Sequence, residues 1–166
     1  KMLFRKVFLV VIEYLVHLRL KSCEYLELKH FLCIELGYVL CQLIGGVLGV
    51  IFANMIFDLD IISISDNKRL TSGIFISEVI ATFGLLITIL LVGKQKTEMV
   101  APAVGLYIGA AYWFTSSTSF SNPAVTIART LSNTFTGIIP SDVIPFIFAQ
   151  LIGTLIVYFI YKHVYE

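Results

Sequence analysis

Four long apolar segments constrain this chain more than any other feature, because each is long enough to cross a lipid bilayer. They cover roughly residues 34–57, 73–93, 100–118 and 141–162. A helix needs about 20 apolar residues to span the hydrocarbon core of a membrane. Hydrophobic residues make up 58% of the chain and charged residues only 14%, far from the balance of soluble domains. We therefore expect an all-α integral membrane protein with about four spanning helices.

Basic residues at two places predict the orientation of these helices. Lys94 and Lys96 lie in the short turn between the second and third segments, and Lys162 and His163 lie at the end of the chain. Lys and Arg are enriched in the cytoplasmic loops of membrane proteins. The sequence therefore predicts that this turn and the C-terminus are cytoplasmic and that the connection at 119–140 is on the opposite side.

Charged and metal-ligating residues exclude several classes of function. The net charge is +1 and no basic stripe is present, so we expect no nucleic-acid partner. The histidines lie at segment ends and form no cluster, so we expect neither a metal nor a cofactor and predict that the chain is not an enzyme: His17, His30 and His163. The cysteines lack metal-ligand spacing and are expected to be small buried apolar residues: Cys23, Cys33 and Cys41.

Small residues recur at helix-packing intervals in two of the apolar segments. Gly45 and Gly49 form one pair, and a second stripe consists of Ala101, Gly105 and Gly109. Such stripes allow helix backbones to approach closely in lipid, so we expect these positions to be packed against other helices.

An internal repeat indicates that the protein is built from two halves. The segment YVLCQLIGGVLGVIF (38–52) aligns without gaps with FIFAQLIGTLIVYFI (146–160), and both contain QLIG, with Gln42 and Gln150 in equivalent places. A glutamine within a membrane is costly unless it is hydrogen-bonded. Duplicated halves are typical of channels and transporters with a site between the halves.

The polar run after residue 118 predicts a short helix that begins inside the membrane. In STSFSNPAVTIARTLSNTFTG, Asn122 is a good N-cap and Pro123 suits the first helical position. A helix over 123–133 is roughly 16 Å long, about half of a 30 Å hydrocarbon core. Its positive N-terminal end and the Asn122 amide would face a pore, where they would repel cations and donate hydrogen bonds to neutral solutes.

Several segments of the chain resemble the aquaporin family of major intrinsic proteins. The resemblance rests on SNPAVT (121–126), SEVIATFGLLIT (77–88) and the two QLIG segments, and it is strongest to bacterial aquaglyceroporins associated with arsenic resistance. It implies an aquaporin-like helical bundle, normally six spanning helices and two re-entrant half-helices. It also implies a homotetramer in the bacterial inner membrane that passively conducts small neutral solutes: water, glycerol and arsenic(III) hydroxide.

The resemblance also assigns roles to particular residues. The pore motif is Asn122, Pro123 and Ala124. Glu78 occupies the intramembrane glutamate position and is expected to accept hydrogen bonds from the re-entrant loop backbone, although a carboxylate at this depth can also act in a proton relay. We favour the structural role, because only one such carboxylate is evident in the spans. The equivalent supporting residues in the two halves are Gln42 and Gln150.

One departure from the family concerns the outer constriction of the pore. The residue directly after Asn-Pro-Ala is usually Arg, but here it is Val125. The other constriction positions fall on Ala110 and Ser119. These three side chains predict a wide, weakly polar filter that admits solutes larger than water. Arg129 lies four residues further along the helix, and we do not assign it to the filter.

A second departure is that the chain contains one Asn-Pro-Ala box, whereas the family has two. The repeat places the counterpart of Asn122 near Tyr14, where no such motif occurs. We therefore expect a divergent or disrupted segment at 1–33, followed at 34–163 by an aquaporin-like channel domain from the third to the sixth span. Two alternatives to a conducting channel stay open: a secondary transporter and a non-conducting truncated fragment.

Overall fold

A computed structural model of the chain describes residues 25–165, with side chains described over 36–164. In this range the structure is entirely helical, which confirms the expected all-α class. The helices are α2 (Tyr25–Ile56), α3 (Ser72–Gln95), α4 (Val100–Phe114), α5 (Pro123–Ala128) and α6 (Val143–Tyr165), joined by the 3₁₀ turns η1 (Thr97–Met99), η2 (Arg129–Leu131) and η3 (Pro140–Asp142). The expectations for Tyr14, His17 and Cys23 lie outside the described residues, as do those for the side chains of His30 and Cys33.

Three helices within the described residues are long and apolar enough to cross a membrane. They cover Leu36–Ile56, Ser72–Gln95 and Pro140–Val164, in agreement with three of the four predicted segments. The first of them belongs to a longer helix, because α2 already begins at Tyr25 and continues through residue 33 without a break.

The fourth predicted span, 100–118, is shorter in the structure than the sequence suggested. Helix α4 has 15 residues and ends at Phe114. Thr115 ends it, because its backbone is extended while its N–H and its hydroxyl both donate to the carbonyl of Ala111, at 3.1 and 2.6 Å. Residues 115–118 are Thr-Ser-Ser-Thr, and the chain turns into a loop there.

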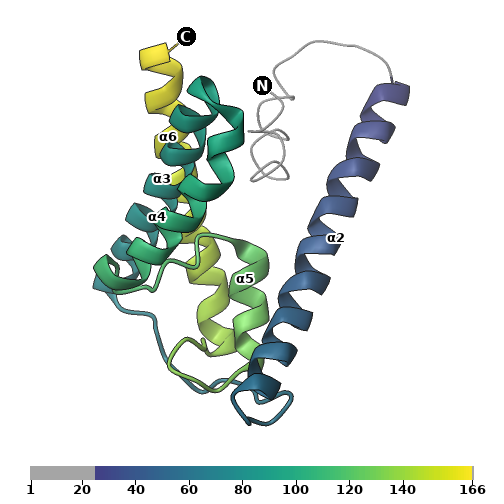
Figure 1. The fold of residues 1–166 in the computed structure, drawn as a ribbon, viewed down its shortest axis with the longest axis vertical. Helices are drawn as coiled ribbons and strands as arrows, with labels where there is room; N and C mark the ends of the chain where they lie inside the picture. Colours follow the sequence, from purple (N-terminus) through teal and green to yellow (C-terminus); the bar gives the residue numbers. More distant parts are fainter. Residues whose placement is uncertain (1–24, 166) are drawn as a thin grey trace.

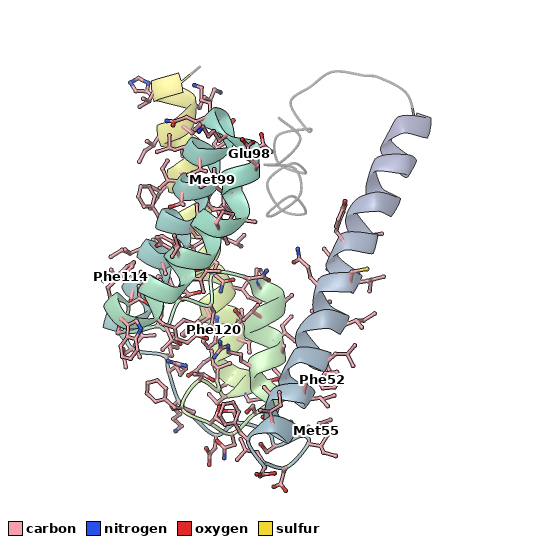
Figure 2. The ribbon with its side chains drawn as sticks, viewed as in Figure 1. Phe52, Met55, Glu98, Met99, Phe114 and Phe120 are labelled. Atoms are coloured by element: carbon pink, nitrogen blue, oxygen red, sulfur yellow. The ribbon has the colours of Figure 1, made fainter. Side chains whose placement is uncertain are left out.

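Helix α3 lies at the centre of the packed bundle. It packs along α6 on one side and against α4 on the other, while α2 contacts the rest of the described chain chiefly through α5 and η2 (Figure 1). The turn at Glu98 and Met99 lies at the same end of the molecule as the C-terminus (Figure 2). This arrangement agrees with the predicted placement of both on one side of the membrane.

Close helix packing depends on different glycines from those expected. A Cβ at Gly153 of α6 would lie 2.6 Å from the carbonyl oxygen of Val79 in α3, and one at Gly46 would lie 3.1 Å from Cβ of Ala128. The approach at Gly153 requires glycine, and the approach at Gly46 leaves little room for a methyl group. Within the described residues nothing packs against the predicted positions, since no described atom outside their own helix turns lies within 4 Å of a Cβ added there: Gly45, Gly49, Gly105 and Gly109.

Large apolar side chains cover much of the outside of the described bundle. Trp113 is 91% exposed and Ile144 is 78% exposed. Such a surface suits the lipid interior, where apolar side chains need no burial against protein. Cys41 also lies on this surface as an exposed free thiol, so its expected burial was wrong.

Candidate functional site at the Asn-Pro-Ala half-helix

The Asn-Pro-Ala segment forms the N-terminus of α5 in the way its residue types predict. Asn122 has extended backbone (φ −156°), and its Oδ1 accepts hydrogen bonds from the backbone N–H groups of Ala124 (2.8 Å) and Val125 (3.4 Å). Pro123 occupies the first turn, where its missing N–H costs nothing. Because Oδ1 is occupied by the cap, the Nδ2 of Asn122 is left to donate outward. Helix α5 ends at Ala128 and η2 continues to Leu131, slightly short of the predicted 133.

The loop before α5 has an unusual backbone conformation. Thr118, Ser119 and Ser121 have φ values of 59°, 48° and 47°, the left-handed region that costs a non-glycine residue roughly 1 kcal/mol or more. Such a conformation persists only where its surroundings hold it. The three residues are buried together beneath α5, so contacts from the neighbouring helices hold the loop.

Glu78 of α3 holds this loop through hydrogen bonds to its backbone. Its side chain is fully buried, Oε1 accepts the backbone N–H of Ser121 at 2.6 Å, and Oε2 accepts that of Phe120 at 3.3 Å. The side-chain amide of Gln150 in α6 donates to the same Oε1 at 2.8 Å. Three donors therefore converge on one carboxylate, which connects the loop and α6 to α3.

Gln150 connects three helices around the site. Its Nε2 donates to Glu78 of α3 and, at 2.9 Å, to the hydroxyl of Thr126 in α5, which in turn donates to the carbonyl of Asn122. Gln42, its counterpart in the repeat, is exposed on α2 and makes no hydrogen bond to the described residues. The described structure thus brings Gln150 into the site and leaves Gln42 outside it.

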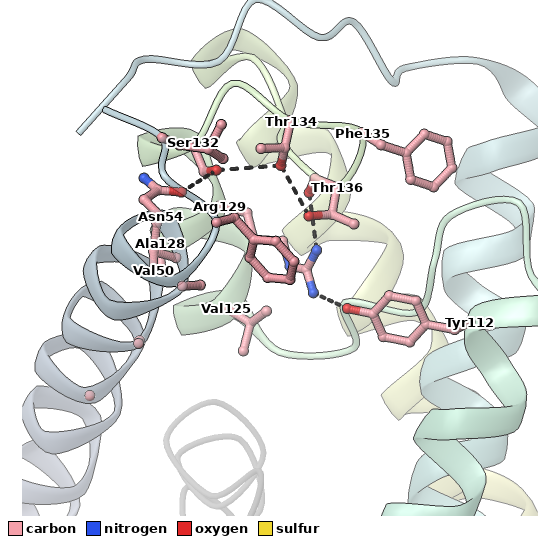
Figure 3. Close-up of a pocket in the computed structure, with 16 residues that line it drawn as sticks. Val50, Asn54, Tyr112, Val125, Ala128, Arg129, Ser132, Thr134, Phe135 and Thr136 are labelled. Carbon is pink, nitrogen blue, oxygen red and sulfur yellow. Dashed lines mark hydrogen bonds between the residues drawn. The ribbon is translucent and has the colours of Figure 1, made fainter. Parts of the chain in front are cut away.

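A cavity of about 670 Å³ lies beside α5, between α2 and the polar loop that follows η2 (Figure 3). Gly45 and Gly49 of α2 line this cavity, which explains why no described residue packs against them. Of the three predicted filter residues, Val125 lines this cavity. The other two predicted filter residues do not line it: Ala110 is exposed on α4, and Ser119 is buried with its hydroxyl 3.1 Å from that of Ser121.

Arg129 and Tyr112 are site residues that sequence reasoning did not assign. The Nη1 of Arg129 donates to the carbonyl of Thr136 at 3.2 Å, and its Nη2 donates to the hydroxyl of Tyr112 (Figure 3). The guanidinium also stacks over the ring of Phe120 at 4.8 Å. Helical spacing could have placed Arg129 on the same face as Val125, one turn on. No sequence signal pointed to Tyr112, which comes from another helix.

Asn54 attaches α2 to the end of the half-helix. Its side chain is 2% exposed, and Nδ2 donates to the carbonyls of Ile61 (3.1 Å) and Leu131 (3.3 Å). The hydroxyl of Ser132 donates to Oδ1 at 2.7 Å. This network fixes the C-terminal end of α2 against one wall of the cavity.

A second arginine lies near the site but does not line the cavity. Arg69 also packs over the ring of Phe120, 5.1 Å from its centroid, and its Nη1 donates to the carbonyl of Gly137 at 3.4 Å. Burial, with a smaller contribution from Arg129, lowers the pKa of Arg69 from its usual value. Its backbone N–H donates to Asp142 at 2.8 Å, so this arginine joins the start of α3 to the start of α6.

No metal centre is formed by the described residues, among which no three His, Cys, Asp or Glu side chains are grouped closely enough to hold an ion. The site consists instead of a capped half-helix, a carboxylate-held loop and a cavity with amide, hydroxyl and guanidinium groups on its wall. This set of groups can donate hydrogen bonds to a solute, and it contains no nucleophile paired with a base.

Three apolar helices of membrane-spanning length and a short capped helix beginning within the bundle define the class: a helical integral membrane protein of aquaporin-like architecture. The chain is 46% identical over 111 residues to the aquaglyceroporin AqpS of Rhizobium meliloti (strain 1021). The match covers 67% of this chain and 48% of the relative, so the chain spans about half the length of that protein. It is a homologue of a bacterial aquaglyceroporin, and not an enzyme. No family model and no solved structure matches it.

Proposed function

We propose that the protein forms a passive channel for small neutral solutes. The observation that carries this proposal is the start of α5 at Asn122, inside the bundle and next to a cavity lined by Val125. A helix that begins within a membrane is tolerated where it lines a water-filled space. The homology to a protein named aquaglyceroporin supports the same class of activity.

The N-terminal end of the half-helix determines which solutes can pass through the channel. Its N-terminal end carries a partial positive charge, and Asn122 adds a free amide donor there. A neutral solute that accepts hydrogen bonds is compensated for the water it loses, whereas a cation or a hydronium ion meets a repulsive potential. Glu78 and Gln150 contribute by holding the loop and the helix in place rather than by moving protons.

The small side chain of Val125 favours solutes larger than water. It leaves the cavity beside the half-helix open, and we propose glycerol and neutral arsenic(III) hydroxide as solutes in addition to water. The cavity supports Val125 as a filter residue, because this side chain lines it. Ala110 and Ser119 do not line the cavity that the described residues form.

The exposed surfaces and the charges support a proposal about the assembly and the orientation of the channel. We propose a homotetramer in the bacterial inner membrane, with the channel domain at 34–163. Many large apolar side chains outside the bundle are available for lipid and for other copies. Lys94, Lys96 and Lys162 lie at one end, which we assign to the cytoplasm together with the C-terminus.

Stopped-flow light scattering on liposomes that contain the protein tests this function. We expect glycerol to enter at a rate proportional to its gradient, without saturation and without dependence on sodium or proton gradients. Glycerol entry no faster than in protein-free liposomes would reject the channel and favour a non-conducting fragment. Saturable uptake driven by an ion gradient would instead identify a secondary transporter.

A further inference from the structure

Three hydroxyl groups form a row on the wall of the cavity beside α5. In the loop after η2, Ser132, Thr134 and Thr136 all line the cavity, so every second residue contributes its side chain to the same wall (Figure 3). Their oxygens follow one another at 3.3 Å from Ser132 to Thr134 and at 3.3 Å from Thr134 to Thr136. We call these three side chains the hydroxyl ladder. Ser132 is buried, and the two threonines are half-buried.

Asn54 fixes one end of the hydroxyl ladder. Its Nδ2 donates to the carbonyls of Ile61 and Leu131, so its Oδ1 is the atom that is presented to Ser132. The hydroxyl of Ser132 has one proton for two acceptors, Oδ1 of Asn54 at 2.7 Å and Oγ1 of Thr134 at 3.3 Å. Because the contact with the amide oxygen is shorter, that oxygen takes the larger share of the proton.

The hydroxyl ladder has more capacity to accept hydrogen bonds than the described chain uses. A hydroxyl oxygen has two lone pairs but only one proton. The proton of Ser132 is directed mainly at Asn54, and one further proton lies between Thr134 and Thr136. No donor of the described residues outside the ladder bonds to these three oxygens. This wall therefore suits a ligand that presents several O–H donors in a row.

Apolar side chains make up much of the remaining lining of the cavity. They belong to Val50, Ala53, Phe57, Leu59 and Val125. A polar solute that enters such a space loses water and needs compensating hydrogen bonds, which the hydroxyl ladder can supply. The cavity volume of about 670 Å³ also lies within the range of small-molecule sites, roughly 300–1,000 Å³. The space thus fits a molecule with hydroxyls on one side and C–H groups on the other.

We infer that the hydroxyl ladder is a binding site for linear polyols longer than glycerol. Neighbouring hydroxyls of such a chain lie roughly 3 Å apart, close to the spacing of the ladder oxygens. A six-carbon polyol can meet the three oxygens in several registers and covers more of the apolar lining than glycerol does. It therefore binds more tightly than glycerol and obstructs its passage. This effect on flux rests on the proposed channel function, whereas the binding itself does not.

The first test measures glycerol flux in liposomes that contain the protein, with sorbitol at the same concentration inside and outside. Glycine betaine at the same osmolarity serves as the reference, because it has no O–H or N–H donor. Replacing Thr134 and Thr136 together by valine removes two hydroxyls and keeps the shape of the side chains, and Thr136→Val alone is the milder variant. Thr130→Val is the matched control, because Thr130 does not line the cavity and its hydroxyl donates to the carbonyl of Ile127 at 2.7 Å.

We expect sorbitol to lower the glycerol flux of the unchanged protein at least about threefold relative to betaine, and Thr130→Val should behave in the same way. In the double variant the reduction should be less than about 1.5-fold, because two of the three acceptors are gone. Thr136→Val alone should lie between these values. An equal reduction in the double variant and the unchanged protein, or no reduction in the unchanged protein, would overturn the inference.

Thermal unfolding in detergent tests the binding site without any measurement of flux. Sorbitol stabilises proteins in general as an osmolyte, so its effect is compared between proteins. We expect the rise in the unfolding midpoint to be about 2 °C or more larger for the unchanged protein and for Thr130→Val than for the double variant. Equal rises would overturn the inference. A larger rise in the unchanged protein without any glycerol flux would reject the channel function and support the polyol site.

Discussion

The carboxylate of Glu78 lies 2.6 Å from the backbone nitrogen of Ser121, and this contact joins the middle of α3 to a loop more than forty positions further along the chain. Ser121 has a left-handed backbone, so the bond holds a residue in a conformation that it would not adopt alone. The position of Asn122, the next residue, depends on this bond. The hydrogen bonds of a buried carboxylate thus help to fix where the half-helix begins.

Glu78→Gln should weaken both the fold and the flux. The substitution replaces one acceptor oxygen by an NH₂ group in a site where three donors converge, so a buried donor loses its partner. We expect a loss of about 2 kcal/mol in stability, measured by thermal unfolding in detergent, and a severalfold fall in glycerol flux. Glu98→Gln, an exposed carboxylate, serves as the control and should change neither. Unchanged stability with a loss of proton-coupled transport would contradict the supporting role and identify a proton relay.

Asn122→Asp should create a cation leak without unfolding the helix. Aspartate is as good an N-cap as asparagine and favours the positive end of a helix, so α5 should still form. The added negative charge, however, cancels the potential that repels cations. We expect a measurable potassium or proton current across planar bilayers, and none for Asn122→Ser, which keeps a neutral cap. If the two variants have the same current, the barrier is not located at this residue.

Val125→Arg should narrow the cavity. A long side chain at this position would project into the space beside α5, and we expect glycerol flux to fall at least about tenfold, with a smaller effect on water because water is smaller. Val125→Ala, which makes the side chain smaller instead of larger, is the control and should leave glycerol flux unchanged or higher. Stopped-flow measurements with each solute provide the ratio. Glycerol and arsenic(III) hydroxide fluxes that are unaffected by Val125→Arg would remove Val125 from the filter.

Tyr112→Phe should release the guanidinium of Arg129 from α4. The charge stays in the cavity, so the protein should stay impermeable to potassium. The freed side chain can then cover the space in front of Val125, and we expect the ratio of glycerol to water flux to fall about two- to fivefold. A general loss of structure would lower both fluxes together, which separates a positioning role from a folding defect. An unchanged ratio would show that Tyr112 does not position Arg129.

Gly153→Ala should destabilise the pairing of α3 with α6. The new methyl group would lie 2.6 Å from the carbonyl oxygen of Val79, a backbone atom that cannot move aside on its own. We expect a cost of about 1–3 kcal/mol, seen as a lower midpoint of thermal unfolding in detergent. Gly105→Ala, where the added methyl group meets nothing in the described chain, should be neutral or slightly stabilising because alanine favours helix. Equal effects of the two changes would indicate that the close approach does not limit stability.

The sequence by itself determined the features that depend on neighbours along the chain. Long apolar runs specify spanning helices because the backbone must satisfy its own hydrogen bonds in lipid. Asn122 and Pro123 specify the start of α5 because the cap is a bond to residues two and three positions away. The end of α4 was predicted four residues too late: the polar residues 115–118 follow Phe114, and the hydroxyl of Thr115 bonds back to the last turn of the helix.

Only the tertiary structure decided which side chains meet across the bundle. Gly45 and Gly46 are adjacent and chemically identical, yet a Cβ added at Gly46 would meet Ala128 and one at Gly45 would meet no described atom within 4 Å, because the rotation of α2 sets which face meets α5. Gln42 and Gln150 share the same local sequence, but only Gln150 has Glu78 and Thr126 within reach. Arg129 reaches the hydroxyl of a tyrosine from another helix, a contact with no periodicity to reveal it. Local bonds follow from residue order, whereas these contacts follow from the distances and rotations that helix packing imposes.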